Sequence, residues 1–142
     1  MKQKITNVFF LLILSFICLP AVAQVNVPDE IFKALDSGNA EIVSEYFNQN
    51  VQLTVLENDN VYSKAQAQQI LIKFFSDYQP QGFTKLYESS KGNAKYVIGN
   101  LKTKKGGFRV YFLVKEDKGK SYIHQLTIDK QSWSSVFVEL IY

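Results

Sequence analysis

The residues of this chain that could carry acid–base chemistry are one histidine, several carboxylates and eight tyrosines. The imidazole of His124 titrates near neutral pH, so it could act as a general base or contact a ligand. Alternation predicts that Tyr122, His124, Leu126 and Ile128 share the apolar face of one strand. No second group in the sequence is recognisably paired with His124. A half-buried histidine bonded to the backbone is therefore favoured over a catalytic one.

Proton transfer beside a carbonyl group needs a carboxylate in a dry pocket and a donor such as a tyrosine hydroxyl. Asp77, Glu88 and Asp129 lie near the ends of predicted elements, and none falls within an apolar strand face. The sequence therefore favours a non-catalytic binding or accessory module. The alternative is a small isomerase, lyase or hydrolase with His124 or a pocket acid as its base. The tyrosines that could supply the hydroxyl are Tyr46, Tyr62, Tyr78, Tyr96, Tyr111 and Tyr122.

Other kinds of site have little support in the sequence. One histidine and scattered carboxylates give no metal-ligand spacing, so we expect no metal and no cofactor. The pair Gly106-Gly107 falls between two predicted strands, where a turn explains it better than a phosphate-binding loop. Basic and aromatic residues interleave over 102–120, as in single-strand nucleic-acid binders. The exported chain is nearly neutral, however, so surface sugars or lipids are better candidate partners than nucleic acid.

The N-terminal residues predict export from the cytoplasm. Lys2 and Lys4 precede an apolar run over 8–19, and Ala21-Val22-Ala23 places small residues where a signal peptidase reads. The run is shorter than the roughly 20 residues that a membrane span needs, so a signal peptide is favoured over an anchor. Cys18 follows Ile17 rather than a small residue, which argues against a lipoprotein. We expect cleavage after Ala23 and a periplasmic or secreted protein that does not span the membrane.

Composition limits how the remaining domain can be stabilised. Cys18 is the only cysteine, so the exported chain has no disulfide and no thiol nucleophile. Residues 24–142 suit one domain, whose stability must come from packing of the numerous Phe and Tyr side chains. Acids exceed bases over 24–90, and bases exceed acids over 91–142. The simplest account of this asymmetry is lysines on the solvent side of strands.

Three helices are predicted before the strands. Pro28, Asp29 and Glu30 open the first helix, and Gly38 ends it. Asn39 caps a second short helix, whose apolar side is Ile42, Val43, Tyr46 and Phe47. Ser63 and Gln66 form a capping box before a third helix that Pro80 stops. The third helix carries an apolar stripe of Ala67, Ile70, Leu71, Phe74, Phe75 and Tyr78.

The remaining elements are predicted strands. A strand over 51–56 and a short return strand at 61–62 flank a turn at 57–60. After Pro80, strands over 83–89, 95–102, 108–115 and 121–129 are separated by short turns, which predicts an antiparallel meander. The fold class is therefore α+β, with the N-terminal helices packed on the concave face of a curved antiparallel sheet.

This order of elements resembles the nuclear-transport-factor-like (SnoaL-like, cystatin-like) cone fold. More closely, a set of short segments resembles a family of small secreted Gram-negative proteins known only as a domain of unknown function. The resemblance covers about residues 28–130. It implies a cone-like fold and an extracytoplasmic setting, and it carries no catalytic residues. The segments are Tyr62-Ser63-Lys64-Ala65-Gln66-Ala67, Phe74-Phe75, Tyr96-Val97-Ile98-Gly99, Phe108-Arg109-Val110-Tyr111-Phe112 and Ile123-His124-Gln125-Leu126.

These observations divide the chain into a signal peptide (1–23), a cone-like domain (24–130) and an apolar C-terminal extension (131–142). A cone of this kind shelters a modest apolar pocket, which would take a small apolar ligand or a cell-envelope component. The extension beyond the family pattern suggests an added edge strand, a self-association surface such as a homodimer contact, or a recoded gene end. The residues expected to line the pocket are Phe74, Tyr78, Tyr96, Tyr122 and His124.

Overall fold

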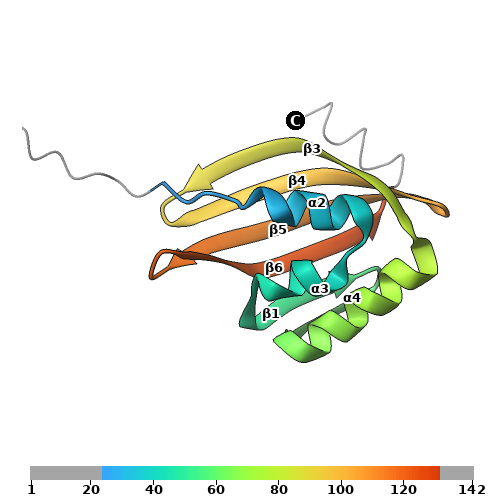
Figure 1. The fold of residues 1–142 in the computed structure, drawn as a ribbon, viewed down its shortest axis with the longest axis horizontal. Coiled ribbons are helices and arrows are strands. Elements are labelled where there is room, and N and C mark those ends of the chain that lie inside the picture. Colours follow the sequence, from blue (N-terminus) through green and yellow to red (C-terminus); the bar gives the residue numbers. More distant parts are fainter. Residues whose placement is uncertain (1–23, 132–142) are drawn as a thin grey trace, which may run out of the picture.

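The computed structural model describes residues 24–131; the predicted leader and residues 132–142 lie outside the described residues. Helices come first and a strand meander last, which confirms the α+β class (Figure 1). No described helix is both long and apolar enough to cross a membrane. The elements are α2 (Asp29–Ser37), α3 (Ala40–Glu45), β1 (Phe47–Val55), β2 (Asn58–Ser63), α4 (Lys64–Tyr78), β3 (Pro80–Lys91), β4 (Ala94–Thr103), β5 (Gly106–Asp117) and β6 (Lys120–Lys130).

A sharp bend joins the first two helices, as predicted. Gly38 ends α2 with φ +70°, a conformation that glycine adopts without the steric cost other residues meet. A Cβ atom on Gly38 would also lie 2.8 Å from the ring of Pro80, so the bend is closely packed. The side chain of Asn39 then accepts a hydrogen bond from the backbone N–H of Ile42 at 3.1 Å, which caps α3.

The third predicted helix, α4, has the expected start and the expected buried stripe. Ser63 and Gln66 form the capping box, each side chain accepting from the other residue's backbone N–H. The C-terminal end lies at Gln79, which has left-handed backbone angles directly before Pro80. The buried residues of the stripe are Ala67, Leu71, Phe74 and Phe75, with Ile70 and Tyr78 partly buried.

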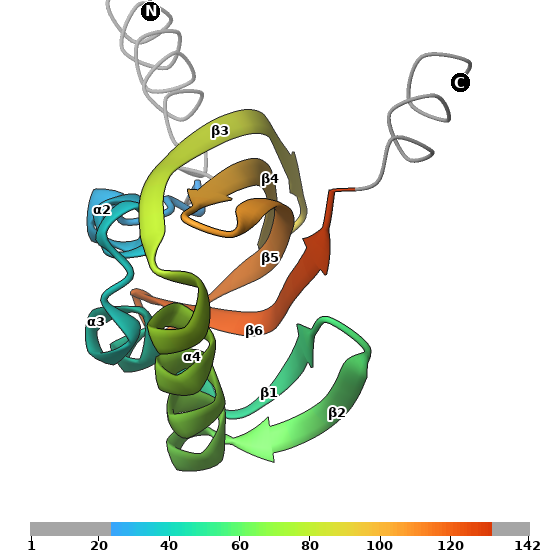
Figure 2. The same ribbon diagram turned by 90° about the vertical axis from the view of Figure 1, so that its right-hand side faces the viewer.

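The six strands form one curved sheet in the order β2-β1-β6-β5-β4-β3 (Figures 1 and 2). The antiparallel meander of β3 to β6 is confirmed. The expectation of an antiparallel sheet is wrong at one place, because β1 and β6 pair in parallel. The chain leaves the β1–β2 hairpin through α4, starts the meander at the far edge and returns to β1 running in the same direction. A parallel pair needs a long connection of this kind.

One face of the sheet and the three helices share a single core. Every second residue of β5 is buried as predicted, at Phe108, Val110, Phe112 and Val114. These side chains belong to the same hydrophobic cluster as the buried residues of α2, α3 and α4. Figure 2 shows the three helices on one side of the sheet. The opposite side, called the outer face below, carries the alternate residues of each strand.

Two sequence expectations are corrected where β6 meets its neighbours. His124 is the extra residue of a β-bulge, because Ile123 pairs with Val114 while Gln125 pairs with Leu113. The bulge breaks the alternation assumed for Tyr122 and His124, so the buried residues of β6 are instead Ile123, Leu126 and Ile128. The second correction concerns Phe47, which was assigned to the second helix.

Phe47 begins β1 instead of extending α3. The backbone carbonyl of Tyr46 accepts a hydrogen bond from the N–H of Ile123 at 2.6 Å, and Phe47 stands opposite Ile123 in the parallel ladder. Phe47 is buried in this position. The helical spacing of apolar residues predicted a helix at Phe47. Pairing with β6, a strand far away in the sequence, placed this residue in a strand instead.

Contacts between α2 and β3 fix the first helix on the sheet. The rings of Phe32 and Phe83 stack with centroids 6.1 Å apart, and the backbone N–H of Phe83 donates to Asp36 Oδ1 at 2.8 Å.

Two ion pairs surround Glu88 on β3. Its carboxylate accepts from Lys85 at 2.6 Å and from Lys95 of β4 at 2.8 Å. These two ion pairs lower the pKa of the Glu88 carboxyl below its usual value of 4.5, the contact with Lys85 being the larger cause.

We expect the pH dependence of folding to reveal the Glu88 ion pairs. The pKa of Glu88 is lowered in the folded state, so its contribution is full above the unfolded value of 4.5 and fades as pH falls through the folded value. Urea unfolding should therefore show a stability difference between wild type and Glu88→Gln that is full at pH 7 and shrinks below pH 4.5. A difference that stays constant down to pH 3 would contradict this assignment.

A second prediction concerns Gly99 in the middle of β4. A Cβ atom on Gly99 would clash with the ring of Phe83 and would lie 2.8 Å from the backbone oxygen of Thr84, so either the edge strand or the ring must move. Gly99→Ala should lower the free energy of unfolding by about 1–3 kcal/mol in a chemical denaturation experiment. Gly82→Ala is the control, because its Cβ would find only an ordinary contact at 3.7 Å.

Candidate functional site

A hollow of about 320 Å³ lies between α4 and the β1–β2 hairpin. Helix α4 begins directly where β2 ends, packs against β1 and then runs toward β3. The turn of the hairpin therefore faces the second half of the helix, and the hollow lies between them. The residues that line it are Val55, Leu56, Asn58, Tyr62, Ile70, Lys73, Phe74, Asp77 and Tyr78.

The floor of this hollow is aromatic. The rings of Phe74 and Tyr78 are stacked with centroids 4.8 Å apart, and both meet the edge or face of Phe108 from β5, at 5.1 and 4.9 Å. Stacked and edge-to-face pairs of this kind add about 0.5–1.5 kcal/mol each beyond the burial of their area. Phe108 is itself fully buried, so the floor is rigid and belongs to the core.

The wall opposite the helix carries a strained residue. Leu56, in the two-residue turn between β1 and β2, has φ +57°, a left-handed conformation that branched side chains rarely adopt. Its backbone N–H donates to the carbonyl of Ile128 at 2.9 Å, which ties the turn to β6. Strained residues of this kind are concentrated at ligand-binding and active sites. The side chain of Leu56 lines the hollow.

The lining of the hollow includes one amide, Asn58, and two charged side chains, Lys73 and Asp77. Lys73 and Asp77 form an ion pair at 3.0 Å on successive turns of α4, with both side chains largely exposed. Within residues 24–131, no hydrogen bond connects the hydroxyl of Tyr62 or Tyr78 to another residue. The hydroxyls are thus free to bond a ligand that enters between the helix and the hairpin. The arrangement suits an apolar body with one polar end.

A second hollow of about 510 Å³ adjoins the first and shares Leu56 and Asn58 with it. Its other lining residues include Asp129 at the end of β6. Burial, and then the nearby charge of Asp59, raises the pKa of the Asp129 carboxyl. This carboxyl group lies beyond the hairpin turn and outside the aromatic hollow. Among the described residues, no three potential ligands are grouped in a way that could hold a metal ion.

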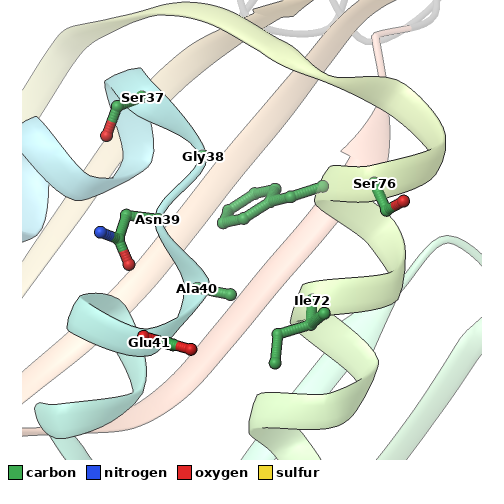
Figure 3. A pocket seen from close by; sticks show the side chains of 8 residues that line it. Ser37, Gly38, Asn39, Ala40, Glu41, Ile72 and Ser76 are labelled. Atoms are coloured by element: carbon green, nitrogen blue, oxygen red, sulfur yellow. The ribbon is translucent and has the colours of Figure 1, made fainter.

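A third hollow, of about 540 Å³, lies between the α2–α3 link and α4. Figure 3 shows Ile72 of α4 across a gap from Ala40 and Glu41. Two polar side chains of the link form hydrogen bonds with the backbone. Asn39 caps α3, and Ser37 Oγ donates to the carbonyl of Lys33 at 2.9 Å. These bonds engage the Oδ1 atom of Asn39 and the hydroxyl proton of Ser37, and the lining has one aromatic ring, Phe75. The hollow beside α4 and the hairpin is therefore the better candidate site.

The structure brings together two of the five residues expected to line a pocket. Phe74 and Tyr78 form the floor of the hollow. Tyr96 lies on the outer face of β4, where its ring is 6.1 Å from that of Tyr111. Tyr122 stands opposite Lys115, near the other end of the sheet. Neighbouring residues of a strand point to opposite faces, so Tyr96 and Tyr122 lie across the sheet from the buried Val97 and Ile123.

His124 lies at the bulge of β6, far from the aromatic floor in the strand register. Burial and the nearby Lys115 lower the pKa of its imidazole, while Asp117 opposes this shift weakly. His124 is therefore uncharged at neutral pH. It lines none of the three hollows described above.

One tyrosine hydroxyl does contact a carboxylate. Tyr46 donates to Glu30 Oε2 at 2.5 Å, and this hydrogen bond, followed by burial, raises the pKa of Tyr46 to about 12. Glu30 is exposed in the first turn of α2, so the pair links α2 to the end of α3 at the surface. It does not form the enclosed acid–hydroxyl pair that proton abstraction requires.

The sequence contains only part of the signal for this site. Ile70 belongs to the predicted stripe of α4, and its position at the edge of that stripe indicates partial burial. Leu56 and Asn58 could not be assigned to the site, because the hairpin turn was expected at 57–60 and lies at Leu56-Glu57 instead. Which side chains of the hairpin face the helix depends on this register.

The chain is similar to several solved structures. It is 27% identical to a DUF4783 family protein from Bacteroides ovatus, with a TM-score of 0.72, 75% of this chain and 96% of that chain being covered. For a DUF4783 family protein from Bacteroides uniformis the identity is 29%, the TM-score is 0.71, and the coverage is 75% and 99%. No curated protein matches the chain.

More distant structures show the fold alone. A protein of the Rd1NTF2 series is 12% identical, with a TM-score of 0.58 over 70% of this chain and 90% of that one. This likeness agrees with the expected nuclear-transport-factor-like fold. The model of the family described as "Domain of unknown function (DUF4783)" matches residues 28–129, which is most of the chain and nearly all of the described domain. The chain therefore belongs to the DUF4783 family.

Proposed function

We propose that this domain is a non-catalytic binding module that holds a small apolar ligand between α4 and the β1–β2 hairpin. The observation that carries the proposal is the hollow of about 320 Å³ with an aromatic floor made by Phe74 and Tyr78, whose rings pack on the buried Phe108. Its volume is at the lower end of the range for small-molecule sites. The ligand is either free or the apolar part of a cell-envelope component.

The chemistry of the lining supports binding more than catalysis. Apolar and aromatic side chains supply most of the surface, and the hydroxyls of Tyr62 and Tyr78 supply a few oriented polar groups. Catalysis of proton transfer would need a base beside such a hydroxyl. The carboxylate at the rim, Asp77, is instead paired with Lys73 in an exposed position.

The proposed place of action is the periplasm or the cell exterior. Residues 1–23 have the charged start, apolar stretch and small-residue end of a secretory signal. The domain has no cysteine after Cys18, so an oxidising compartment finds no thiol in it to oxidise. We also propose that the helices close the concave side of the curved sheet, which would keep water out of the aromatic floor.

Binding of an apolar fluorescent probe, 1-anilinonaphthalene-8-sulfonate, tests this proposal. We expect the exported chain, residues 24–142, to bind the probe in its folded state. At a hundredfold excess over Kd the probe should stabilise the domain by about 2.7 kcal/mol, which raises the melting temperature. Ile70→Trp should weaken binding about tenfold, or by about 1.4 kcal/mol, because the larger ring fills the mouth of the hollow.

Ile72→Trp is the matched control for the Ile70 variant. Ile72 lies on the same helix, is 37% exposed and lines the third hollow instead. Its substitution should leave probe binding unchanged. Both variants must unfold cooperatively, because loosely packed states also bind this probe. Equal binding by the two variants, or the lack of any stabilisation of the wild type, would refute the proposed site.

A further inference from the structure

The outer face of the sheet carries an apolar patch, which we define by Tyr87, Tyr96, Ile98, Tyr111 and Leu113. The strand registers place these residues next to one another: Ile98 stands opposite both Tyr111 and Tyr87, and Leu113 stands opposite Tyr96. Tyr87 is 57% exposed and the other four are half-buried. The patch therefore spans three adjacent strands, β3, β4 and β5.

The three described helices all lie on the other side of the sheet, so none of them covers this patch (Figure 2). A contiguous apolar patch at the surface usually marks a contact with another segment or another molecule.

The described part of the chain ends on this face. The backbone N–H of Gln131 donates to the carbonyl of Gly107 at 3.2 Å, so pairing with β5 continues one residue beyond β6. The Gln131 side chain lies over Gly107, since a Cβ added to that glycine would be 2.8 Å from Gln131 Oε1. Gly107 alternates with the buried Phe108 and therefore belongs to the outer face. Residue 132 consequently starts on the outer face at the Gly107 end of β5, four residues along the strand from Tyr111, or about 13 Å.

The residues that follow have the composition of a covering segment. Residues 132–142 include Trp133, Phe137 and Tyr142, and Glu139 is their only charged residue. Eleven extended residues can reach up to about 36–40 Å. The patch lies about 13–20 Å along β5 from Gly107 and extends two strand spacings, or about 10 Å, across the sheet. The segment is long enough to lie across the patch without any change in the sheet.

We propose that residues 132–142 dock on the outer face of their own domain and cover the patch. This contact buries apolar side chains on both sides, and it gives the extension a role inside one molecule instead of between two. The tethering supports an intramolecular contact, because a segment joined directly at Gln131 has a high effective concentration beside β5. This inference is independent of the ligand site, which lies on the other side of the sheet.

Trp133 is the only tryptophan of the chain, so its fluorescence reports on the docking directly. In residues 24–142 we expect blue-shifted emission and protection from acrylamide quenching. Ile98→Lys should shift the emission to the red and remove the protection, because a charge in the middle of the patch opposes docking. Val61→Lys is the matched control: Val61 is already 62% exposed on β2, three strands away from β5.

Tyr87→Lys serves as a second variant in case Ile98→Lys does not fold, since Tyr87 is already well exposed. It should lower the protection of Trp133 without a loss of far-ultraviolet circular dichroism. Light scattering decides between one chain and two: docking in one molecule predicts a monomer with a protected Trp133. Protection only in a dimer would overturn the proposal in favour of exchange with a second copy. Exposed Trp133 in wild type, or equal protection in all variants, would overturn docking altogether.

Discussion

The contact of Phe74 and Tyr78 with Phe108 holds the third helix against the sheet. Three rings from two distant segments meet there, with centroids 4.8 to 5.1 Å apart. Phe108 belongs to the first half of β5, one strand away from the parallel partner of β1. The rings therefore fix the C-terminal end of α4 over the middle of the sheet, while Ser63 fixes its start at the end of β2. Both ends of the helix are thus constrained.

The candidate site follows from those two constraints. The helix begins at the hairpin and ends on the aromatic rings, so the hairpin turn faces its later turns across a gap. A strained residue, Leu56, and its bond to Ile128 hold the turn in place. The hollow is lined on one side by core residues that cannot move without disrupting the packing. The proposed binding role rests on this rigid aromatic floor and on the hydroxyls of Tyr62 and Tyr78.

The two faces of the sheet differ in how deeply their side chains are buried. The face under the helices contains the core, and Gly99 allows Phe83 to approach it closely. The outer face alternates with it residue by residue and carries Tyr96, Tyr111 and Ile98 on its surface. The family model matches residues 28–129, so residues 132–142 lie outside the matched range. The described chain ends on the same outer face, at Gly107, four residues along β5 from Tyr111 of the apolar patch.

The sequence by itself determined the local structure, because caps, turns and periodicity depend on neighbouring residues. The capping box at Ser63, the bend at Gly38 and the alternation through Phe108 and Phe112 were all predicted correctly. Tertiary structure decided what depends on pairing between distant segments: the parallel contact of β1 with β6, the strand start at Phe47 and the bulge at His124. That single extra residue moved His124 away from the expected pocket, since strand alternation reverses at every inserted residue. The sequence accordingly predicted the part of the site that α4 supplies, Phe74 and Tyr78. It did not predict the part that the β1–β2 hairpin supplies, because the register of the hairpin is fixed only when the chain folds.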